Sequence, residues 1–236
     1  KRSSFSSRIG FVLAAAGSAV GLGNIWRFPY LAAKYGGGIF LLVYVLLVVT
    51  FGFSLMVAEI ALGRKTGLSV IGAYRSLNRK WAFLGVLSAI VPIIIVPYYS
   101  VIGGWVTKYF ADFVTGMGAA TAGDAYFSSF ISNDWMPLIW LAVFIGLTFV
   151  TVLTGVQKGI EKVSKFLMPV LVLLTIAVTI YSITLPGAME GVAYYFKPDF
   201  SKFSIETVLA AMGQMFYSMS LAMGIMVTYG SYMGKK

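Results

Sequence analysis

Long apolar runs recur along this chain, and they restrict its fold more than any other sequence feature. A helix of roughly 20 apolar residues crosses the hydrocarbon core of a bilayer, where helical backbone satisfies its own N–H and C=O groups. Hydrophobic residues make up 59% of the sequence and charged residues only 11%, which is too apolar for a soluble domain. We therefore predict an all-α integral membrane protein with six transmembrane helices, at residues 9–33, 38–62, 82–111, 135–154, 164–185 and 206–232.

Charged residues in the connections predict the orientation of these spans. Residues 63–81 contain five lysines or arginines, whereas residues 112–134 contain three aspartates and no basic residue. Basic connections stay on the cytoplasmic side, so we expect both termini of the chain in the cytoplasm and the protein in the plasma membrane. The net charge of +10 is spread over such connections rather than gathered in one patch, so we expect no nucleic-acid partner.

The sequence offers little for enzymatic chemistry. It contains no cysteine and no histidine, which excludes disulfides, thiolate metal sites and histidine-based catalysis within this chain. It also lacks paired carboxylates and a nucleophile elbow. We expect neither an enzyme nor an organic cofactor.

The first span contains a segment that disfavours a continuous helix. Residues 17–30 read GSAVGLGNIWRFPY, with Gly21 and Gly23 on either side of one leucine. Glycine costs about 1 kcal/mol of helix propensity relative to alanine. The helix therefore either unwinds here or uses its small residues to pack closely against another helix.

An unwound segment would present free carbonyl oxygens to a cation and free N–H groups to an anion. No carboxylate lies in this stretch, so a zwitterionic substrate would bring its own negative charge. The hard oxygen donors that suit sodium are the carbonyls of Gly17, Ala19 and Val20 and the amide oxygen of Asn24.

The sixth span has polar side chains at its centre. Ser218 and Ser220 precede Gly224 in an otherwise apolar and aromatic helix. The serines either bond back to their own helix or mark a second break. At such a break, Tyr217 and Met223 would provide aromatic and flexible apolar surface for a hydrophobic side chain.

In the third span, Tyr99 follows Pro97, which frees a backbone carbonyl and lets the helix bend. Ile95 lies on the same helix face as Tyr99 because four residues separate them. The Tyr99 hydroxyl needs a partner within the membrane. That partner is either a substrate carboxylate or the backbone of a neighbouring helix.

Charged residues inside membrane spans indicate function by default. Arg27 lies on the outer side of the first break, where it would close an extracellular gate by pairing with an acid. Glu59 either accepts hydrogen bonds from unwound backbone or reaches the membrane interface. At the inner end of the fifth span, Gly159 and Pro169 predict a weak helix, which is either an amphipathic entry to the membrane or a section that unwinds to admit water and sodium.

Taken together, four segments resemble the neurotransmitter:sodium symporters, especially their bacterial amino-acid members. The similarity covers nearly all 236 residues. The segments are GSAVGLGNIWRFPY at 17–30, YGGGIF at 35–40, PYYS at 97–100 and GQMFYSMSLAMG at 213–224.

The resemblance implies a LeuT-type fold, with ten core helices in two inverted repeats and alternating access around a site at mid-membrane depth. Helices 1 and 6 would be discontinuous. Residues 1–185 would form the first five-helix repeat, and residues 186–236 an outer loop and the first helix of an incomplete second repeat.

The resemblance also implies roles for individual residues. Amides near Leu22 and the Tyr99 hydroxyl would hold the substrate carboxylate, and carbonyls near Ser218 would meet its amine. The substrate-binding set is Ala19, Gly21, Leu22, Gly23, Ile95, Tyr99, Tyr217, Ser218, Ser220 and Met223. Sodium would bind Gly17 and Val20 at one site and Ala19, Asn24 and Ser218 at another. The gate would consist of Arg27, Tyr99 and Tyr217. Gly159 and Pro169 would form the cytoplasmic unwinding motif, and Glu59 would make a structural polar contact.

Two positions bear on the substrate. Members that carry monoamines have an aspartate at the position of Gly21, so glycine favours amino acids, which bring their own carboxylate. Met223 stands where a leucine-selective relative has a bulkier phenylalanine, which favours large or aromatic side chains. The expected function is sodium-coupled symport of a hydrophobic, large or aromatic amino acid.

The chain ends just after the sixth span, whereas complete members of the family continue for about as long again. We therefore expect the C-terminal helices of the same transporter as a partner, in addition to the lipid bilayer and the amino acid. The competing class is a membrane channel or structural subunit whose glycines only pack helices. That class predicts no saturable, sodium-dependent binding.

Overall fold

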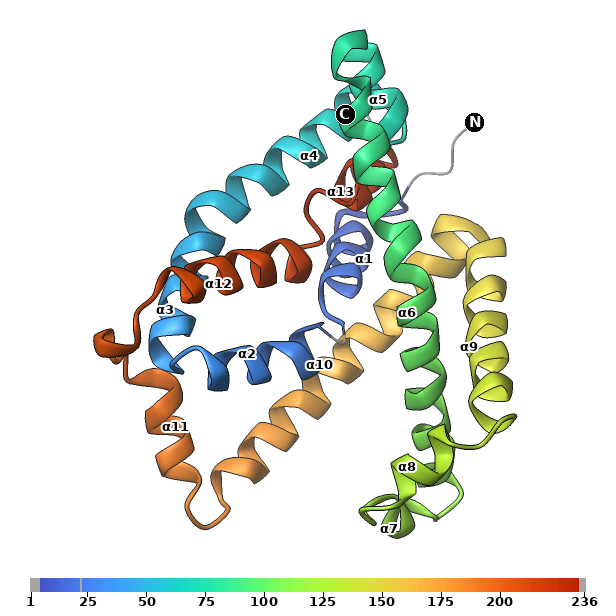
Figure 1. Cartoon of the computed structure of the whole chain (residues 1–236). Coiled ribbons are helices and arrows are strands. Elements are labelled where there is room, and N and C mark those ends of the chain that lie inside the picture. Colours follow the sequence, from blue (N-terminus) through green and yellow to red (C-terminus); the bar gives the residue numbers. More distant parts are fainter. Residues whose placement is uncertain (1–4, 22, 234–236) are drawn as a thin grey trace. The chain divides into compact units, whose positions relative to one another are not determined.

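The computed structural model describes residues 5–21 and 23–233, and within them the chain is helical apart from turns and one isolated bridge between Gly37 and Pro198. It divides into two compact units, one of residues 1–89 with 161–236 and the other of residues 90–160. α6 (Ala82–Val114) begins in the first unit and continues into the second. Figure 1 labels the helices in chain order.

The first unit holds both segments that the sequence singles out as candidate breaks. Its helices begin at serine caps where the sequence provides them: the Gly10 N–H donates to the Ser7 hydroxyl and the Thr207 N–H to the Ser204 hydroxyl. The elements of the first unit are α1 (Arg8–Ala19), the π-helical turn Gly23–Arg27, α2 (Phe28–Lys34), α3 (Gly38–Leu47), the π-helical turn Val48–Gly52, α4 (Phe53–Thr66), α5 (Val70–Leu77), the 3-10 turn Arg79–Trp81, α10 (Lys162–Ile183), α11 (Ala188–Phe196), the 3-10 turn Phe200–Lys202, α12 (Ile205–Ser218) and α13 (Ile225–Ser231).

Close backbone packing joins α4 and α13. A Cβ atom on Gly63 would overlap the Val227 carbonyl, and one on Gly230 would overlap the Ile60 carbonyl. Glycines let two helices approach this closely, as small residues commonly do in membranes. Val227 also packs against α5, and Figure 1 shows α13 close to α4 and α5.

A second core of the first unit forms where α2, α3 and α12 meet. Leu31, Ala32, Phe40 and Ala211 are buried together there. The Phe28 ring packs edge-on against the rings of Phe40 and Tyr44, with centroids 5.5 and 4.8 Å away. This core fixes the outer part of the first span against the start of the sixth.

The second unit consists of the rest of α6 with α7 (Gly118–Thr121), α8 (Tyr126–Ile131), α9 (Met136–Leu153) and the π-helical turn Val156–Glu161, whose last residue belongs to the first unit. Gly104 lets α6 approach the backbone of α9 at Leu141. The C-terminal part of α6 carries an ion pair between Lys108 and the buried carboxylate of Asp112. The Tyr126 hydroxyl completes this cluster by donating to Asp112 Oδ2 at 2.5 Å.

The six predicted spans all fall on helices, and their ends differ from the predictions by a few residues only. Four stretches of the described residues are long and apolar enough to cross a membrane. α1 and the helical stretch Gly23–Lys34 meet the same requirement when they are taken together as a fifth span, and the two are bent by 52° relative to each other. The sixth predicted span does not reach the required length because it is divided into α12, with 14 residues, and α13, with 7. The four long stretches are Gly38–Thr66, Arg79–Val114, Met136–Leu153 and Val156–Ile183.

The connections are less simple than the sequence suggested. α5, α7, α8 and α11 lie in segments that were expected to be plain loops. Each is too short to cross a bilayer, so a search for long apolar runs misses it.

Candidate functional site

Two helix breaks in the first unit lie against each other. α1 ends at Ala19 and a helix resumes at Gly23, while α12 ends at Ser218 and α13 begins at Ile225. The Ser220 hydroxyl donates to the Ser18 carbonyl at 3.0 Å, which joins the two breaks directly. Figure 1 shows the gaps between α1 and α2 and between α12 and α13. The prediction that the first and sixth helices are discontinuous is confirmed.

Left-handed backbone produces the second break. Ser220 has φ +53°, Ala222 has φ +58° and Gly224 has φ +70°. Residues other than glycine rarely adopt this region, and each such residue costs on the order of 1–3 kcal/mol. Strain of this kind persists where the surrounding structure imposes it. Here it turns main-chain groups away from helical hydrogen bonding.

Polar side chains connect the two breaks in a chain of hydrogen bonds. The Asn24 amide nitrogen donates to the Ala19 carbonyl at 2.9 Å, and the Ser218 hydroxyl donates to Asn24 Oδ1 at 2.5 Å. The predicted donors Ala19, Asn24 and Ser218 are therefore brought together in one cluster. The Ser218 hydroxyl donates to Asn24 across the two breaks rather than to a carbonyl of its own helix, which was the alternative for this serine.

Gln214 is a site residue that the sequence reading missed. Its side chain is fully buried, and Nε2 donates to the Gly23 carbonyl at 3.0 Å and to the Ser218 hydroxyl at 2.9 Å. Oε1 is buried without a hydrogen-bond partner among the described residues. A signal was present, since a glutamine one turn before Ser218 is unusual in an apolar span.

An aromatic ring and a guanidinium group lie together next to the first break. The Arg27 guanidinium is 5.5 Å from the centre of the Tyr217 ring, a cation–π geometry. The same ring lies so close to Gly23 that a Cβ atom there would overlap it. The structure thus brings Arg27 and Tyr217 together, as the predicted gate requires.

Glu59 reaches the second break from α4. Its Oε1 accepts a hydrogen bond from the Ala222 N–H at 2.7 Å. Oε2 is buried and has no hydrogen-bond partner in the part of the chain that the structure describes. Of the two interpretations of Glu59, the structure supports the acceptor of unwound backbone.

The remaining residues of the first break surround this cluster. Gly17, near the end of α1, faces Ser164 of α10, and Val20 is extended at φ −89° and ψ 104°. The Gly21 carbonyl accepts from the Asn24 N–H at 3.0 Å. Leu22 lies outside the described residues. Met223 is half-buried within the second break.

Ile95 and Tyr99 lie on α6 in the second unit, and α6 stays helical through Pro97. The rings of Tyr98 and Tyr99 meet edge to face, with centroids 6.0 Å apart. The roles predicted for Ile95 and Tyr99 stay predictions.

The candidate unwinding motif is wound in this structure. Gly159 lies in the π-helical turn Val156–Glu161, and Pro169 lies within α10. A Cβ atom on Gly159 would overlap the Thr151 carbonyl, so the glycine allows close approach of the backbone. Unwinding between the two residues stays a prediction about another conformation.

The geometry of the breaks suits a monovalent cation. The Ala19 carbonyl, the Asn24 amide oxygen and the Ser218 hydroxyl are neutral, hard oxygen donors within one hydrogen-bonded cluster. The C-terminal end of α1 adds the negative end of a helix dipole.

A multi-pass helical membrane protein whose first and sixth spans break opposite each other, with main-chain groups and small polar side chains at the breaks, has the architecture of a secondary transporter. Comparison with known proteins places it more narrowly. The chain belongs to the sodium:neurotransmitter symporter family, whose model matches residues 2–133 and 127–236.

Individual relatives agree with this assignment. The chain is 42% identical to an uncharacterized sodium-dependent transporter, YhdH of Bacillus subtilis, over 98% of this chain and 52% of that protein. It is 28% identical to the sodium-dependent neutral amino acid transporter B(0)AT1 of Mus musculus, over 98% of this chain and 41% of that protein. The crystal structure of MhsT in complex with L-phenylalanine superposes with a TM-score of 0.92 at 42% identity, covering 100% of this chain and 55% of MhsT. The chain thus spans about half the length of the relatives that it matches.

Proposed function

We propose that this chain works within a transporter that carries a hydrophobic amino acid together with sodium across the plasma membrane by alternating access. The observation that carries the proposal is the hydrogen-bonded cluster of Ala19, Asn24 and Ser218, which joins the two helix breaks. Family membership and the names of the sodium-dependent relatives support it. Because the chain spans about half of those relatives, the proposed activity is that of the whole transporter. Both ends of this chain would lie in the cytoplasm.

We propose two sodium sites, with the ligands that the family resemblance implies. One uses the carbonyls of Gly17 and Val20 at the end of α1. The other uses the Ala19 carbonyl, Asn24 Oδ1 and the Ser218 hydroxyl, whose mutual hydrogen bonds of 2.9 and 2.5 Å hold them in place. Each site is completed by donors from the C-terminal half of the transporter.

The substrate carboxylate would lie at the first break, on the main-chain N–H groups of Leu22 and Gly23 and the Tyr99 hydroxyl. Gly21 supplies no side-chain carboxylate, so the substrate brings its own negative charge close to the sodium ion. An amino acid meets this requirement and an amine without a carboxyl group does not. MhsT was crystallised with L-phenylalanine, which agrees with an amino-acid substrate.

The substrate amine would meet carbonyl groups near Tyr217, Ser218 and Ser220, where left-handed backbone leaves the helix. Its side chain would lie against Ile95, Ser220 and Met223. A flexible thioether at residue 223 leaves room for a large or aromatic side chain. Tyr217, held by Arg27 and Gly23, would cover the bound amino acid from the outer side.

Replacing the bridging serine tests this proposal. Ser218→Ala removes a proposed sodium ligand and the bond to Asn24, whereas Ser54→Ala removes only an exposed hydroxyl on α4 that bonds back to the Thr50 carbonyl. Binding of radiolabelled phenylalanine to the reconstituted full-length transporter is measured against sodium concentration. We expect Ser218→Ala to need about tenfold more sodium for half-saturation, because a hydrogen bond or ligand to a charged group contributes on the order of 1.5–3 kcal/mol. Binding that is equal in sodium and potassium would refute sodium coupling and favour a channel or structural subunit.

A further inference from the structure

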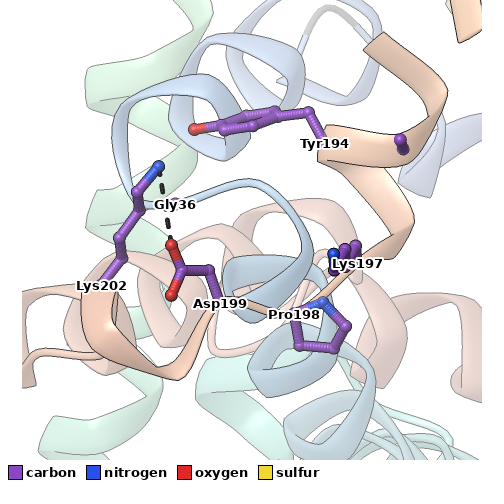
Figure 2. A pocket seen from close by; sticks show the side chains of 7 residues that line it. Gly36, Tyr194, Lys197, Pro198, Asp199 and Lys202 are labelled. Carbon is purple, nitrogen blue, oxygen red and sulfur yellow. Dashed lines mark ion pairs between the residues drawn. The ribbon is translucent and has the colours of Figure 1, made fainter. Parts of the chain in front are cut away.

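The first unit contains a cavity that lies apart from the two helix breaks. Its volume is about 440 Å³, and it lies between the end of the first span and the connection that precedes the sixth. Gly36, Tyr194, Lys197, Pro198, Asp199 and Lys202 border it (Figure 2). The cavity is built into the backbone arrangement, since Gly37 and Pro198 form a bridge and the Tyr194 hydroxyl donates to the Ala33 carbonyl at 2.9 Å.

The lining carries an excess of positive charge. Two lysines, Lys197 and Lys202, face one carboxylate, that of Asp199. Asp199 is engaged elsewhere, because its Oδ1 accepts from the Ser201 hydroxyl at 2.6 Å and from the Ser201 N–H at 3.0 Å. These hydrogen bonds hold the pKa of the Asp199 carboxyl below its ordinary value, so it stays charged at neutral pH.

The ion pair that Asp199 makes is long. Lys202 Nζ is 3.9 Å from Asp199 Oδ2 and 5.3 Å from the centre of the Tyr194 ring. Figure 2 shows these three side chains and the ion pair between Lys202 and Asp199. An exposed pair at this distance is weak. The Lys202 ammonium is therefore available to an anion, with the Tyr194 ring as an apolar wall beside it, and Lys197 adds a second positive charge to the lining.

Aromatic side chains next to the cavity project into the surroundings. The exposed fractions of Phe196, Phe200 and Phe203 are 72%, 71% and 53%. The segment that carries them joins the end of α10 at Ile183 to the start of α12 at Ile205, so it lies where two spans leave the membrane. Aromatic rings at that depth mix with acyl chains, and lysines there meet phosphate groups.

We propose that the cavity between Gly36 and residues 193–202 binds the phosphate headgroup of an anionic phospholipid, with Lys197 and Lys202 on the phosphate and Phe196, Phe200 and Phe203 among the acyl chains. Inorganic phosphate shares the headgroup's charge. The exposed rings favour the lipid, because they can contact the acyl chains of a lipid, whereas a soluble anion has no apolar part for them to contact. The bound lipid would connect the end of α2 to the segment before α12, which are the ends of these two helices that lie away from the helix breaks.

Lipid retention by the full-length protein tests the lysines. The protein is purified from membranes that contain phosphatidylglycerol and phosphatidylcholine, and lipid that remains bound is counted by native mass spectrometry. We expect wild type to retain phosphatidylglycerol preferentially. Lys197→Gln and Lys202→Gln should each weaken that binding roughly fivefold, and the double variant more than tenfold. Lys80→Gln, in an exposed turn of the inner connection, is the matched control and should leave retention unchanged.

Two outcomes would overturn the proposal. Equal retention of phosphatidylglycerol by the double variant and wild type would show that the lysines hold no headgroup. Displacement of the lipid signal by millimolar glycerol phosphate, with the same dependence on both lysines, would assign the cavity to a soluble anion.

A second measurement reports on the rings. Phe200→Trp adds a fluorophore whose emission, taken as the difference from wild type, should be quenched by brominated phosphatidylglycerol in nanodiscs. An unquenched tryptophan would mean that protein rather than lipid covers this surface, and it would likewise overturn the proposal.

Discussion

At the scale of single residues, the second break depends on backbone conformations that side chains usually avoid. Ser220 and Ala222 both have positive φ, and the N–H of Ala222 is turned towards Glu59 on α4. Ala222 is exposed in this half of the transporter, but an N–H without an acceptor costs about 1–3 kcal/mol wherever water does not reach it, as inside a membrane. The carboxylate of Glu59 therefore acts as the replacement for a helical carbonyl.

Substitutions at Glu59 test this role. Glu59→Gln keeps an oxygen acceptor for the Ala222 N–H and should retain most of the stability, whereas Glu59→Leu should lose about 1–3 kcal/mol. Thermal unfolding in nanodiscs of fixed composition measures the difference. Glu190→Leu, at an exposed position of α11, is the control. Equal melting temperatures for Glu59→Leu and wild type would show that Glu59 does not stabilise the break, and would favour the alternative that its side chain only reaches the membrane interface.

At the scale of elements, the broken sixth helix is held in place mainly by α4. The seven residues of α13 cannot span a membrane, and they have glycine contacts with α4 at both Gly63 and Gly230. Each contact places one backbone against another, so no side-chain movement can make room for an added methyl group.

Gly63→Ala and Gly230→Ala should therefore destabilise the protein by about 1–3 kcal/mol each, the usual cost of overpacking. Gly213→Ala on α12 is the matched control, because a Cβ atom there meets nothing within 4 Å. That control should be neutral or stabilising by up to about 1 kcal/mol, since alanine favours helix. Melting temperatures of the three variants under one condition check the prediction, and a loss in Gly213→Ala equal to that in Gly63→Ala would contradict it.

The spans and their breaks could be predicted from the sequence because bilayer thickness and helix propensity act locally. Gly21 and Gly23 around one residue, and two serines before Gly224, marked the candidate breaks, and the family resemblance favoured unwinding over close packing. The role of Gln214 could not be predicted, since it depends on the Gly23 carbonyl 191 positions away in the chain. α5 was missed because its eight residues are too few for a search for long apolar runs, although Val70 and Ala73 share one helix face and pack against Val227.

At the scale of the whole molecule, a contact between residues 155 positions apart connects the N-terminal segment to the start of α10. Glu161 is buried, and it accepts hydrogen bonds from the Ser6 hydroxyl and, at 2.8 Å, from the Ser6 N–H. Lys165 pairs with the same carboxylate at 2.7 Å. Gly10 makes room for it, because a Cβ atom there would overlap the carboxyl group.

Glu161 lies between Gly159 and Pro169, the residues predicted to unwind when the cytoplasmic side opens. While Ser6 is bound to Glu161, the first turn of α10 is held by charge-assisted hydrogen bonds, which contribute on the order of 1.5–3 kcal/mol. Unwinding of this turn therefore requires that the N-terminal segment leave first. The two inner elements should open together rather than independently.

Hydrogen exchange on the full-length protein measures this coupling. Glu161→Gln should raise exchange roughly tenfold or more in residues 5–19 and in residues 159–169 together, because both segments lose the same carboxylate. Lys158→Gln, an exposed substitution in the preceding π-helical turn, should leave both segments as they are in wild type. Faster exchange in residues 5–19 alone would show that the N-terminal segment can detach without loosening α10. In that case the winding of Gly159–Pro169 would rest on the helix itself, and opening of the cytoplasmic side would need no release of Ser6.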